Sequence, residues 1–456
     1  MLKHEKNQTV LALSRVCRSW YHQITCCKNL FSDIAFDVSS EESIVTAGVF
    51  LKTLEGTTVP ISVRAFLGRS SSLDPMLVKL FTRLRPHIQH ISHFEYYGDM
   101  AKYRPYLDLP APELLLFSDC FDTYPGRGPP LFCGQMPRLR EFTTLSPASQ
   151  IVWVTSTLSD LTILNLGFLD MEPCVPFSSF LDLLRGSPRL ESVNVQCFVP
   201  VINPAEDLQD VLLPHLHTLD LQHNEFHTIV KHLRIPNVRK LYFCGESHPV
   251  TGVGLNPTFE APHIFAGLPV LPIFKQPIKM VLSQTKGSGR TEAGFCLHLA
   301  ADGGFDLRVS LFWVLDAVPL FNDYVERSIA GLVEMMTLAP RARVELSHNL
   351  LVPSDVPVYQ PFLLVTNIER LTIRGGFSTE VLSKLTTHAG SQHLLPRLRV
   401  LNIMDWDPFP NEGDRTVLLS CLRSRVVGGA PLSVRLIDAE ACADLSEPEY
   451  DVKREF

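Results

Sequence analysis

Pro214-His-Leu216-His-Thr-Leu219-Asp-Leu221 is the stretch of sequence that decides the fold. Its last two leucines alternate with polar residues, and a period of two is typical of a β-strand with one buried face. Leu216 stands three residues before Leu219, in the turn that leads into this strand. The phrase therefore predicts a strand over residues 217–222 with Leu219 in the core.

The same phrase recurs along the chain. It is found with its proline at 188–195, 236–243 and 396–403, without the proline at 161–166 and 368–373, and in weaker form at 91–96, 114–117 and 139–142. Between Ile91 and Val238 the copies begin 22 to 29 residues apart. We expect parallel strands that include 162–167, 191–196, 217–222, 239–244, 369–374 and 399–404.

Apolar residues at helical spacing lie between the copies, as in Phe177-Ser-Ser-Phe180-Leu181-Asp-Leu183-Leu184. A strand and a helix that repeat with a period in the twenties form a leucine-rich-repeat unit. One unit cannot bury its apolar face alone, so such units stack into a solenoid with parallel strands on the concave side. The sequence thus predicts an α/β fold, a right-handed leucine-rich-repeat solenoid.

The repeats are irregular, because the asparagine that usually follows the strand is present only as Asn224. A closed barrel of alternating strands and helices is the competing prediction. The repeat spacing and the Pro-x-Leu phrase favour the open solenoid.

A second informative stretch lies near the N-terminus. It reads Leu11-Ala-Leu-Ser-Arg-Val16-Cys17-Arg18-Ser19-Trp20-Tyr21-His22-Gln23-Ile24, followed by Asn29-Leu30-Phe31-Ser32-Asp33-Ile34. The apolar residues at 13, 16, 17, 20, 21 and 24 predict one apolar helix face over about three turns. The stretch resembles the C-terminal half of an F-box, in which Val-Cys-Arg-x-Trp precedes a Leu-Trp-x-x-Ile tail. Here Leu30-Phe31 replaces the usual Leu-Trp.

The resemblance implies a partner, because F-boxes bind Skp1, the adaptor of a ubiquitin ligase. The residues that would contact a Skp1-like adaptor are Leu13, Val16, Cys17, Trp20 and Leu30. The first helix of the family, Leu-Pro-x-Glu-x-x-x-x-Ile-Phe, has no counterpart in the residues before Val16, which are polar from Met1 to Thr9. We therefore expect a truncated or degenerate F-box with weak or absent Skp1 binding.

Most of the chain resembles the F-box/leucine-rich proteins of mushroom-forming fungi, most strongly at 11–36, 58–98 and 109–243 and again at 338–350 and 365–405. Members of that family resemble substrate receptors of Skp1–cullin ubiquitin ligases. The expected segments are an F-box-like helical segment at 1–37, a linking helix and strand at 38–85, the solenoid at 86–445 with degenerate repeats at 245–366, and a tail at 446–456. Within the degenerate region, Gly294 to Phe312 predicts two strands about a glycine turn. Phe321 to Met336 predicts a helix, and Ala342 to Leu346 a further strand.

The bulk composition excludes several classes of function. The chain of 456 residues is 45% hydrophobic and 20% charged with a net charge of −7. It has no block of five or more like charges, so neither nucleic acid nor a membrane surface is an expected partner. No apolar run approaches the length of a membrane span. The eleven cysteines include no C-x-x-C pair, and they fit a reducing compartment, cytoplasmic or nuclear.

No constellation of residues predicts an enzyme, a cofactor or a metal site. His215 and His217 alternate with the repeat leucines, and His223 to His227 lacks the glutamate order of a zinc protease. The turn Gly287-Ser-Gly289-Arg290 lacks the Gly-Lys-Ser/Thr ending of a phosphate loop. No Gly-x-Ser-x-Gly elbow is present.

The prediction for function is therefore protein recognition. The polar residues that flank the strand leucines would line a groove for an unknown protein target; they are Asn165, Asn194, Gln196, Asp220, Gln222, Lys240, Tyr242, Arg370, Thr372 and Asn402. The rival hypothesis is a leucine-rich-repeat scaffold with a vestigial F-box that does not bind Skp1. An atypical hydrolase stays open only because residues 245–366 are not assigned.

Overall fold

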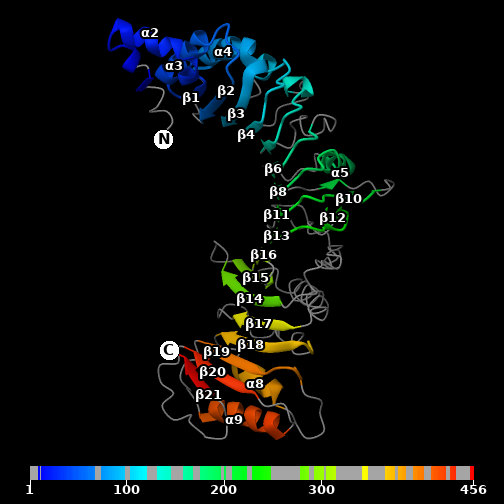
Figure 1. The fold of residues 1–456 in the computed structure, drawn as a ribbon. Coiled ribbons are helices and arrows are strands. Elements are labelled where there is room, and N and C mark those ends of the chain that lie inside the picture. The colour runs from blue at the N-terminus through cyan, green and yellow to red at the C-terminus, as the bar shows by residue number, and fades with distance from the viewer. Residues whose placement is uncertain are drawn as a thin grey trace. The chain divides into compact units, whose positions relative to one another are not determined.

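Figure 1 draws the helices and strands of the chain in the computed structural model. The chain splits into two compact units. Unit 1 comprises Met1–Leu219 and Leu233–Asn237, and unit 2 comprises Asp220–His232 and Val238–Phe456. The structure describes residues 9–10, 12–66, 73–97, 103–120, 131–144, 158–167, 175–196, 200–201, 208–222, 229–247, 278–286, 292–301, 304–314, 341–347, 365–374, 378–386, 394–404, 412–427, 432–437 and 452–455.

Unit 1 contains a parallel sheet in which each strand pairs with the next one along the chain. Its order is β1 (Asp33–Asp37), β2 (Ile61–Phe66), β3 (Ile91–Tyr97), β4 (Leu116–Cys120), β5 (Glu141–Thr144), β6 (Ile163–Gly167) and β8 (Ser192–Gln196). The amides of His217 and Thr218, at the start of β11 (Thr218–Gln222), then bond the carbonyl of Glu191. Two short parallel pairs lie apart from this sheet, β7 (Val175–Pro176) with β9 (Pro200–Val201) and β10 (Val211–Leu212) with β12 (Leu233–Arg234).

Among the described residues of unit 1, the helices with defined bounds are α2 (Arg18–Cys26), α3 (Glu41–Thr53), α4 (Asp74–Leu84) and α5 (Phe177–Arg185), with 3-10 turns η1 (Lys28–Phe31), η3 (Arg85–His90), η4 (Arg104–Tyr106) and η5 (Leu131–Gly134). The hydroxyl of Ser40 accepts a hydrogen bond from the amide of Ser43, which caps α3. Helices α3 and α4 pack on each other, and α3 also packs on β1.

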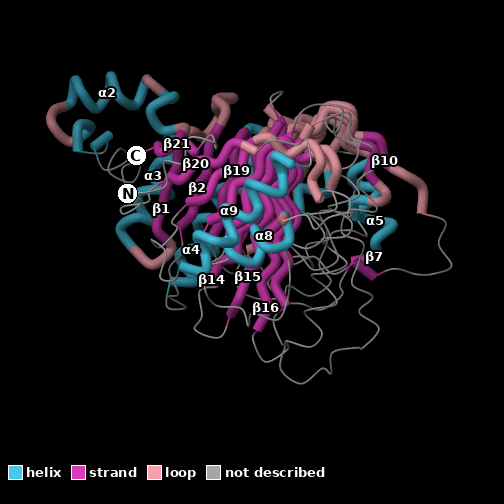
Figure 2. Tube along the Cα trace, turned by 90° about the horizontal axis from the view of Figure 1, so that it is seen from below, coloured by secondary structure: helices cyan, strands magenta, loops and turns pink. Residues whose placement is uncertain are grey.

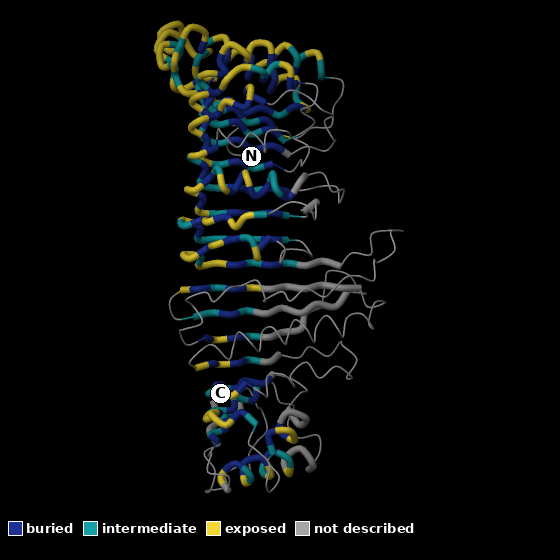
Figure 3. The backbone as a smooth tube through the Cα atoms, turned by 90° about the vertical axis from the view of Figure 1, so that its right-hand side faces the viewer, coloured by how far each residue is buried: buried dark blue, intermediate teal, exposed yellow. Residues whose placement is uncertain are grey.

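Alternation along the strands separates a core from a polar face, and buried residues (dark blue) alternate with intermediate ones (teal) in Figure 3. The core side carries an aromatic ladder. Phe94, Phe117 and Phe142 occupy matching positions of β3, β4 and β5, with ring centroids 6.0 Å and 5.5 Å apart in stacked geometry. All three are 0% exposed, so this ladder joins neighbouring strands through offset aromatic contacts.

The predicted N-terminal helix over 11–24 is interrupted. Cys17 has extended backbone (φ −159°, ψ 168°), and α2 begins after it without a side-chain cap. The amides of Arg15 and Val16 bond carbonyls three residues earlier, as in the tight end of a helical turn. Neither the β-branched Val16 nor Cys17 is a strong helix former, so the helix breaks where its apolar pattern continues.

The strands of unit 2 are also mostly parallel. They are β13 (Lys240–Ser247), β14 (Ile278–Lys286), β15 (Glu292–Ala301), β16 (Phe305–Val314), β17 (Ala342–Ser347), β18 (Ile368–Arg374), β19 (Val400–Met404), β20 (Ser433–Ile437) and β21 (Val452–Glu455). The two helices described in unit 2, α8 (Ser378–Leu385) and α9 (Glu412–Val427), lie side by side (Figure 2).

A meander reverses the order of three strands in unit 2. Strand β13 pairs in parallel with β16 rather than with β14, and β14 pairs in parallel with β17. Strand β15 lies between β14 and β16 and is antiparallel to both. The order is therefore β13-β16-β15-β14-β17, followed by β18 to β21 in sequence.

The chain is thus an α/β protein with a large, mostly parallel sheet, as the repeated phrase predicts. The six predicted strands, the helix at Phe177 and the strand pair around Gly304 are all present. Leu219 is 0% exposed, as expected of a core residue. The predicted helix over 321–336 lies outside the described residues, and the expected segment bounds stay predictions. In the described part of the chain, no helix has the length and apolar character needed to cross a bilayer.

Candidate functional site

An exposed apolar surface lies at the N-terminus. We call it the α2 patch, and its members with their exposed fractions are Leu13 (37%), Val16 (63%), Trp20 (44%), Tyr21 (52%) and Leu30 (39%). Cys17, the remaining residue of the predicted adaptor face, is also exposed. These exposed apolar side chains lie within one short stretch of sequence, and exposed apolar residues of this kind are typical of a surface that binds another molecule.

Helix α2 places none of its side chains in the core of unit 1, since none of its residues is buried. The following turn η1 is anchored instead, since Phe31 is 2% exposed and its ring meets that of Phe50 at 5.0 Å in edge-to-face geometry. Lys28 Nζ also donates to the carbonyl of Thr53 at 2.6 Å. These contacts fix the base of α2 and leave its apolar side chains open.

The polar face of unit 1 carries a row of side chains across its strands. The register aligns Arg64, Glu95, Ser118, Thr143, Asn165 and Asn194 on successive strands from β2 to β8. Asn165 Nδ2 donates to Thr143 Oγ1 at 2.9 Å. Asn194 Oδ1 is buried and accepts no hydrogen bond from the described residues. Gln196 stands two residues after Asn194, on the same face of β8.

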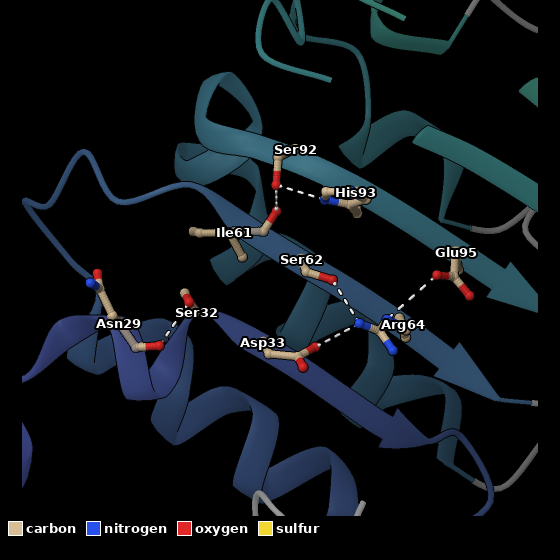
Figure 4. A network of polar contacts seen from close by, with 9 residues as sticks. All are labelled: Asn29, Ser32, Asp33, Ile61, Ser62, Arg64, Ser92, His93 and Glu95. Carbon is tan, nitrogen blue, oxygen red and sulfur yellow. Dashed lines mark hydrogen bonds and ion pairs between the residues drawn. The ribbon is translucent and has the colours of Figure 1, made fainter. Parts of the chain in front are cut away.

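At one end of this row, three charged side chains join three strands (Figure 4). Arg64 on β2 forms ion pairs with Asp33 on β1 at 3.2 Å and with Glu95 on β3 at 3.4 Å. Ser92 on β3 donates to the carbonyl of Ile61 at 3.2 Å. The repeated phrase gave no signal for this ion triad, because β1 and β2 lack its leucines. The sequence does contain another sign of the triad, namely a charged residue next to a buried residue in each of the three strands.

The polar face of unit 2 gathers Tyr242 with charged residues of the meander. Tyr242 Oη lies 3.4 Å from Asp306 Oδ2, and the guanidinium of Arg308 lies 5.5 Å from the centre of the Tyr242 ring. Arg308 pairs with Asp306 at 3.1 Å, and His298 Nε2 lies 2.8 Å from Asp306 Oδ1. Burial, together with the negative charge of Asp306, raises the pKa of Tyr242 above its ordinary value.

The other residues predicted on β11 and β13 are Asp220, Gln222 and Lys240. Asp220 and Gln222 contact each other at 3.5 Å, and burial raises the pKa of the Asp220 carboxyl above its ordinary range. Lys240 is exposed and stands opposite Asp306 in the pairing of β13 with β16. Sequence reasoning missed His298, Asp306 and Arg308, which come from strands outside the repeated phrase.

Further along unit 2, the predicted Thr372 and Asn402 meet on β18 and β19. Asn402 Nδ2 donates to Thr372 Oγ1 at 3.0 Å, the same amide-to-hydroxyl contact that Asn165 makes with Thr143 in unit 1. Arg370 stands two residues before Thr372 on the same face of β18.

The structure thus places the predicted target residues on the polar faces of the two units, in neighbouring strands within each unit. The described residues contain no cluster of three or more metal-binding side chains. The search of protein families found no model that matches this chain, and no curated protein matches it.

Proposed function

We propose that the chain is a non-catalytic protein-recognition module, the substrate receptor of a Skp1–cullin–F-box type ubiquitin ligase. In this proposal the α2 patch binds a Skp1-like adaptor, and the polar faces of an irregular leucine-rich-repeat solenoid hold a protein target. The observation that carries the proposal is the exposure of the α2 patch, in which Trp20 and Tyr21 are 44% and 52% exposed. Aromatic side chains are enriched at the centres of protein interfaces.

The polar faces support the target-binding half of the proposal. Their side chains combine amides, hydroxyls, charges and the ring of Tyr242, a mixture that suits the adaptable hydrogen bonding of a protein interface. Strand positions hold these groups in fixed rows, so a partner meets a preorganised surface and little conformational freedom is lost on binding.

The second candidate is a leucine-rich-repeat scaffold whose vestigial F-box does not bind Skp1. The break of the helix at Cys17 favours this alternative, because it divides the apolar residues between two segments. Leu13 and Val16 precede the break, whereas Trp20 follows it.

A pull-down with purified Skp1 separates the two candidates. The residues before Val16 show no counterpart of the first F-box helix, so the expected capture of Skp1 is weak. Trp20→Ala and Leu30→Ala remove exposed apolar contacts, so each should lower that capture further by about tenfold or more, the typical cost of truncating a central interface residue. Leu109→Ala is the matched control, since Leu109 is 37% exposed and Leu30 39%, and it lies outside the α2 patch. This control should bind as the unchanged chain does.

Thermal melts accompany the binding measurements. Because α2 has no buried residue, we expect Trp20→Ala to leave the melting temperature nearly unchanged. Skp1 binding that is equally strong in both α2 variants would refute the assigned surface. Absence of Skp1 binding in the unchanged chain would favour the scaffold.

A further inference from the structure

Three basic residues stand side by side on the polar face of unit 2. The pairing of β14 with β17 places Lys279 opposite Arg343, and the pairing of β17 with β18 places Arg343 opposite Arg370. We call these three residues the basic row. Neighbouring strands of a sheet lie about 4.8 Å apart, so the three side chains leave the backbone at nearly the closest spacing that a sheet allows.

Burial shows that the basic row faces away from the core. Arg343 is exposed between Ala342 and Val344, which are 0% and 2% exposed. Lys279 is likewise exposed and precedes the fully buried Met280, while Arg370 is half-buried. The side chains of the row therefore project from one face of β14, β17 and β18.

The neighbouring carboxylates leave most of this charge uncompensated. Glu345 lies 3.7 Å from Lys279, and Glu369 pairs with Arg341 at 3.5 Å. Among the described residues, no carboxylate pairs with Arg343 or Arg370. Like charges on directly opposed positions of neighbouring strands destabilise a sheet. The row therefore costs folding stability, in a chain whose net charge is −7.

We propose that the basic row binds an acidic helical segment of a protein partner. This inference rests on the proposed function, in which the polar faces hold a protein target, and it assigns the chemistry of that target. Side chains at positions i and i+4 of a helix lie about 5–6 Å apart, which matches the strand spacing across which the row extends. A helix laid across the strands can thus present glutamates at i, i+4 and i+8 to Lys279, Arg343 and Arg370 in turn.

The residue types of the row fit carboxylates. Two of the three are arginines, whose planar guanidinium groups can bind a carboxylate through two parallel hydrogen bonds. Binding would also relieve the repulsion within the row, so the cost in stability is offset only when the partner is present. Binding of single-stranded nucleic acid usually relies on stacking of bases on aromatic side chains. None of the three residues of the row is aromatic, so the row does not favour that kind of partner.

Fluorescence anisotropy on the full chain tests the inference. The probe is a labelled helical peptide with glutamate at i, i+4 and i+8, and a peptide with glutamine at these positions is its neutral counterpart. The glutamate peptide should bind more tightly, and the difference should shrink as salt is added. Arg343→Gln and Arg370→Gln should each weaken binding about tenfold, as expected for the loss of a charge-assisted contact.

Arg397→Gln is the matched control. Arg397 is an exposed arginine of unit 2 in the turn before β19, so the variant removes the same charge outside the row and should keep its affinity. Urea denaturation should give Arg343→Gln and Arg370→Gln midpoints equal to or above that of the unchanged chain. Lower midpoints would show that these arginines support the fold, which would overturn the inference.

Three further results would overturn it. They are equal binding of the two peptides, an equal loss of binding in Arg397→Gln, and tighter binding of a single-stranded oligonucleotide than of the glutamate peptide. Capture of Skp1 does not involve the basic row. If the glutamate peptide does not bind while Skp1 capture is intact, this inference alone is rejected. Loss of Skp1 capture bears instead on the proposed function.

Discussion

Arg425 in α9 is 0% exposed, and it is the largest of the fully buried side chains described in the protein. Its guanidinium donates to the carbonyl of Leu395 at 3.1 Å and to that of Leu394. Leu395 has a positive φ of 50°, a conformation that costs a leucine free energy and needs support from its surroundings. Burial lowers the pKa of Arg425, yet these two bonds hold the charge inside unit 2.

Replacement of Arg425 by methionine tests this role. Arg425→Met keeps the apolar stem but leaves two carbonyls without donors, and we expect a loss of about 1–3 kcal/mol in the free energy of unfolding for each carbonyl that water cannot reach. Urea denaturation measures the loss, and the exposed Arg397→Met serves as the control. An unchanged midpoint would mean that the turn around Leu395 holds its conformation without Arg425.

At the scale of elements, the ion triad of Asp33, Arg64 and Glu95 joins β1, β2 and β3. The Arg64 side chain is 14% exposed and each carboxylate 25%, so water screens these ion pairs less than it screens pairs on the open surface. Arg64→Met leaves two carboxylates without their shared partner, and we expect it to cost about 1.5–3 kcal/mol in the free energy of unfolding.

A second arginine of unit 1 gives the matched comparison. Arg138 pairs with Glu113, but these side chains are 55% and 48% exposed. Arg138→Met should therefore cost only about 0–1 kcal/mol. Denaturation of both variants at low and high salt measures the contrast. Equal losses in Arg64→Met and Arg138→Met would contradict the structural importance assigned to the triad.

The elements also show what the sequence can predict. Strands such as β6, β8 and β11 follow from the leucine pairs alone, because burial of alternate side chains specifies a strand locally. The pairing of β13 with β16 could not be predicted in this way, because it depends on which distant strand meets an edge. The polar-face residues Asn165, Thr372 and Asn402 flank leucines of the repeated phrase, so the sequence predicts them. Arg64, Asp306 and Arg343 were missed, because their strands lack the full phrase.

At the scale of the molecule, the two units differ in how far apart in sequence their paired strands lie. In unit 1 every strand of the main sheet meets its successor, so that Leu116 stands opposite Glu141 and Glu141 opposite Ile163. In unit 2 the meander places Lys240 opposite Asp306 and Ile278 opposite Ala342. Both units therefore contain parallel strand pairs. Unit 1 forms them through short chain connections, whereas the meander of unit 2 requires long ones.

This difference has a consequence for folding kinetics. A contact between distant residues requires closure of a longer loop, and proteins rich in such contacts fold more slowly. We expect amides of β3 to β6 to become protected before those of β13 and β16 when the unfolded chain is returned to native buffer. Pulsed hydrogen exchange read by mass spectrometry measures the order. Until β16 arrives, the edge of β13 that it will occupy stays open to pairing with other chains, so unit 2 passes through the longer period of aggregation risk.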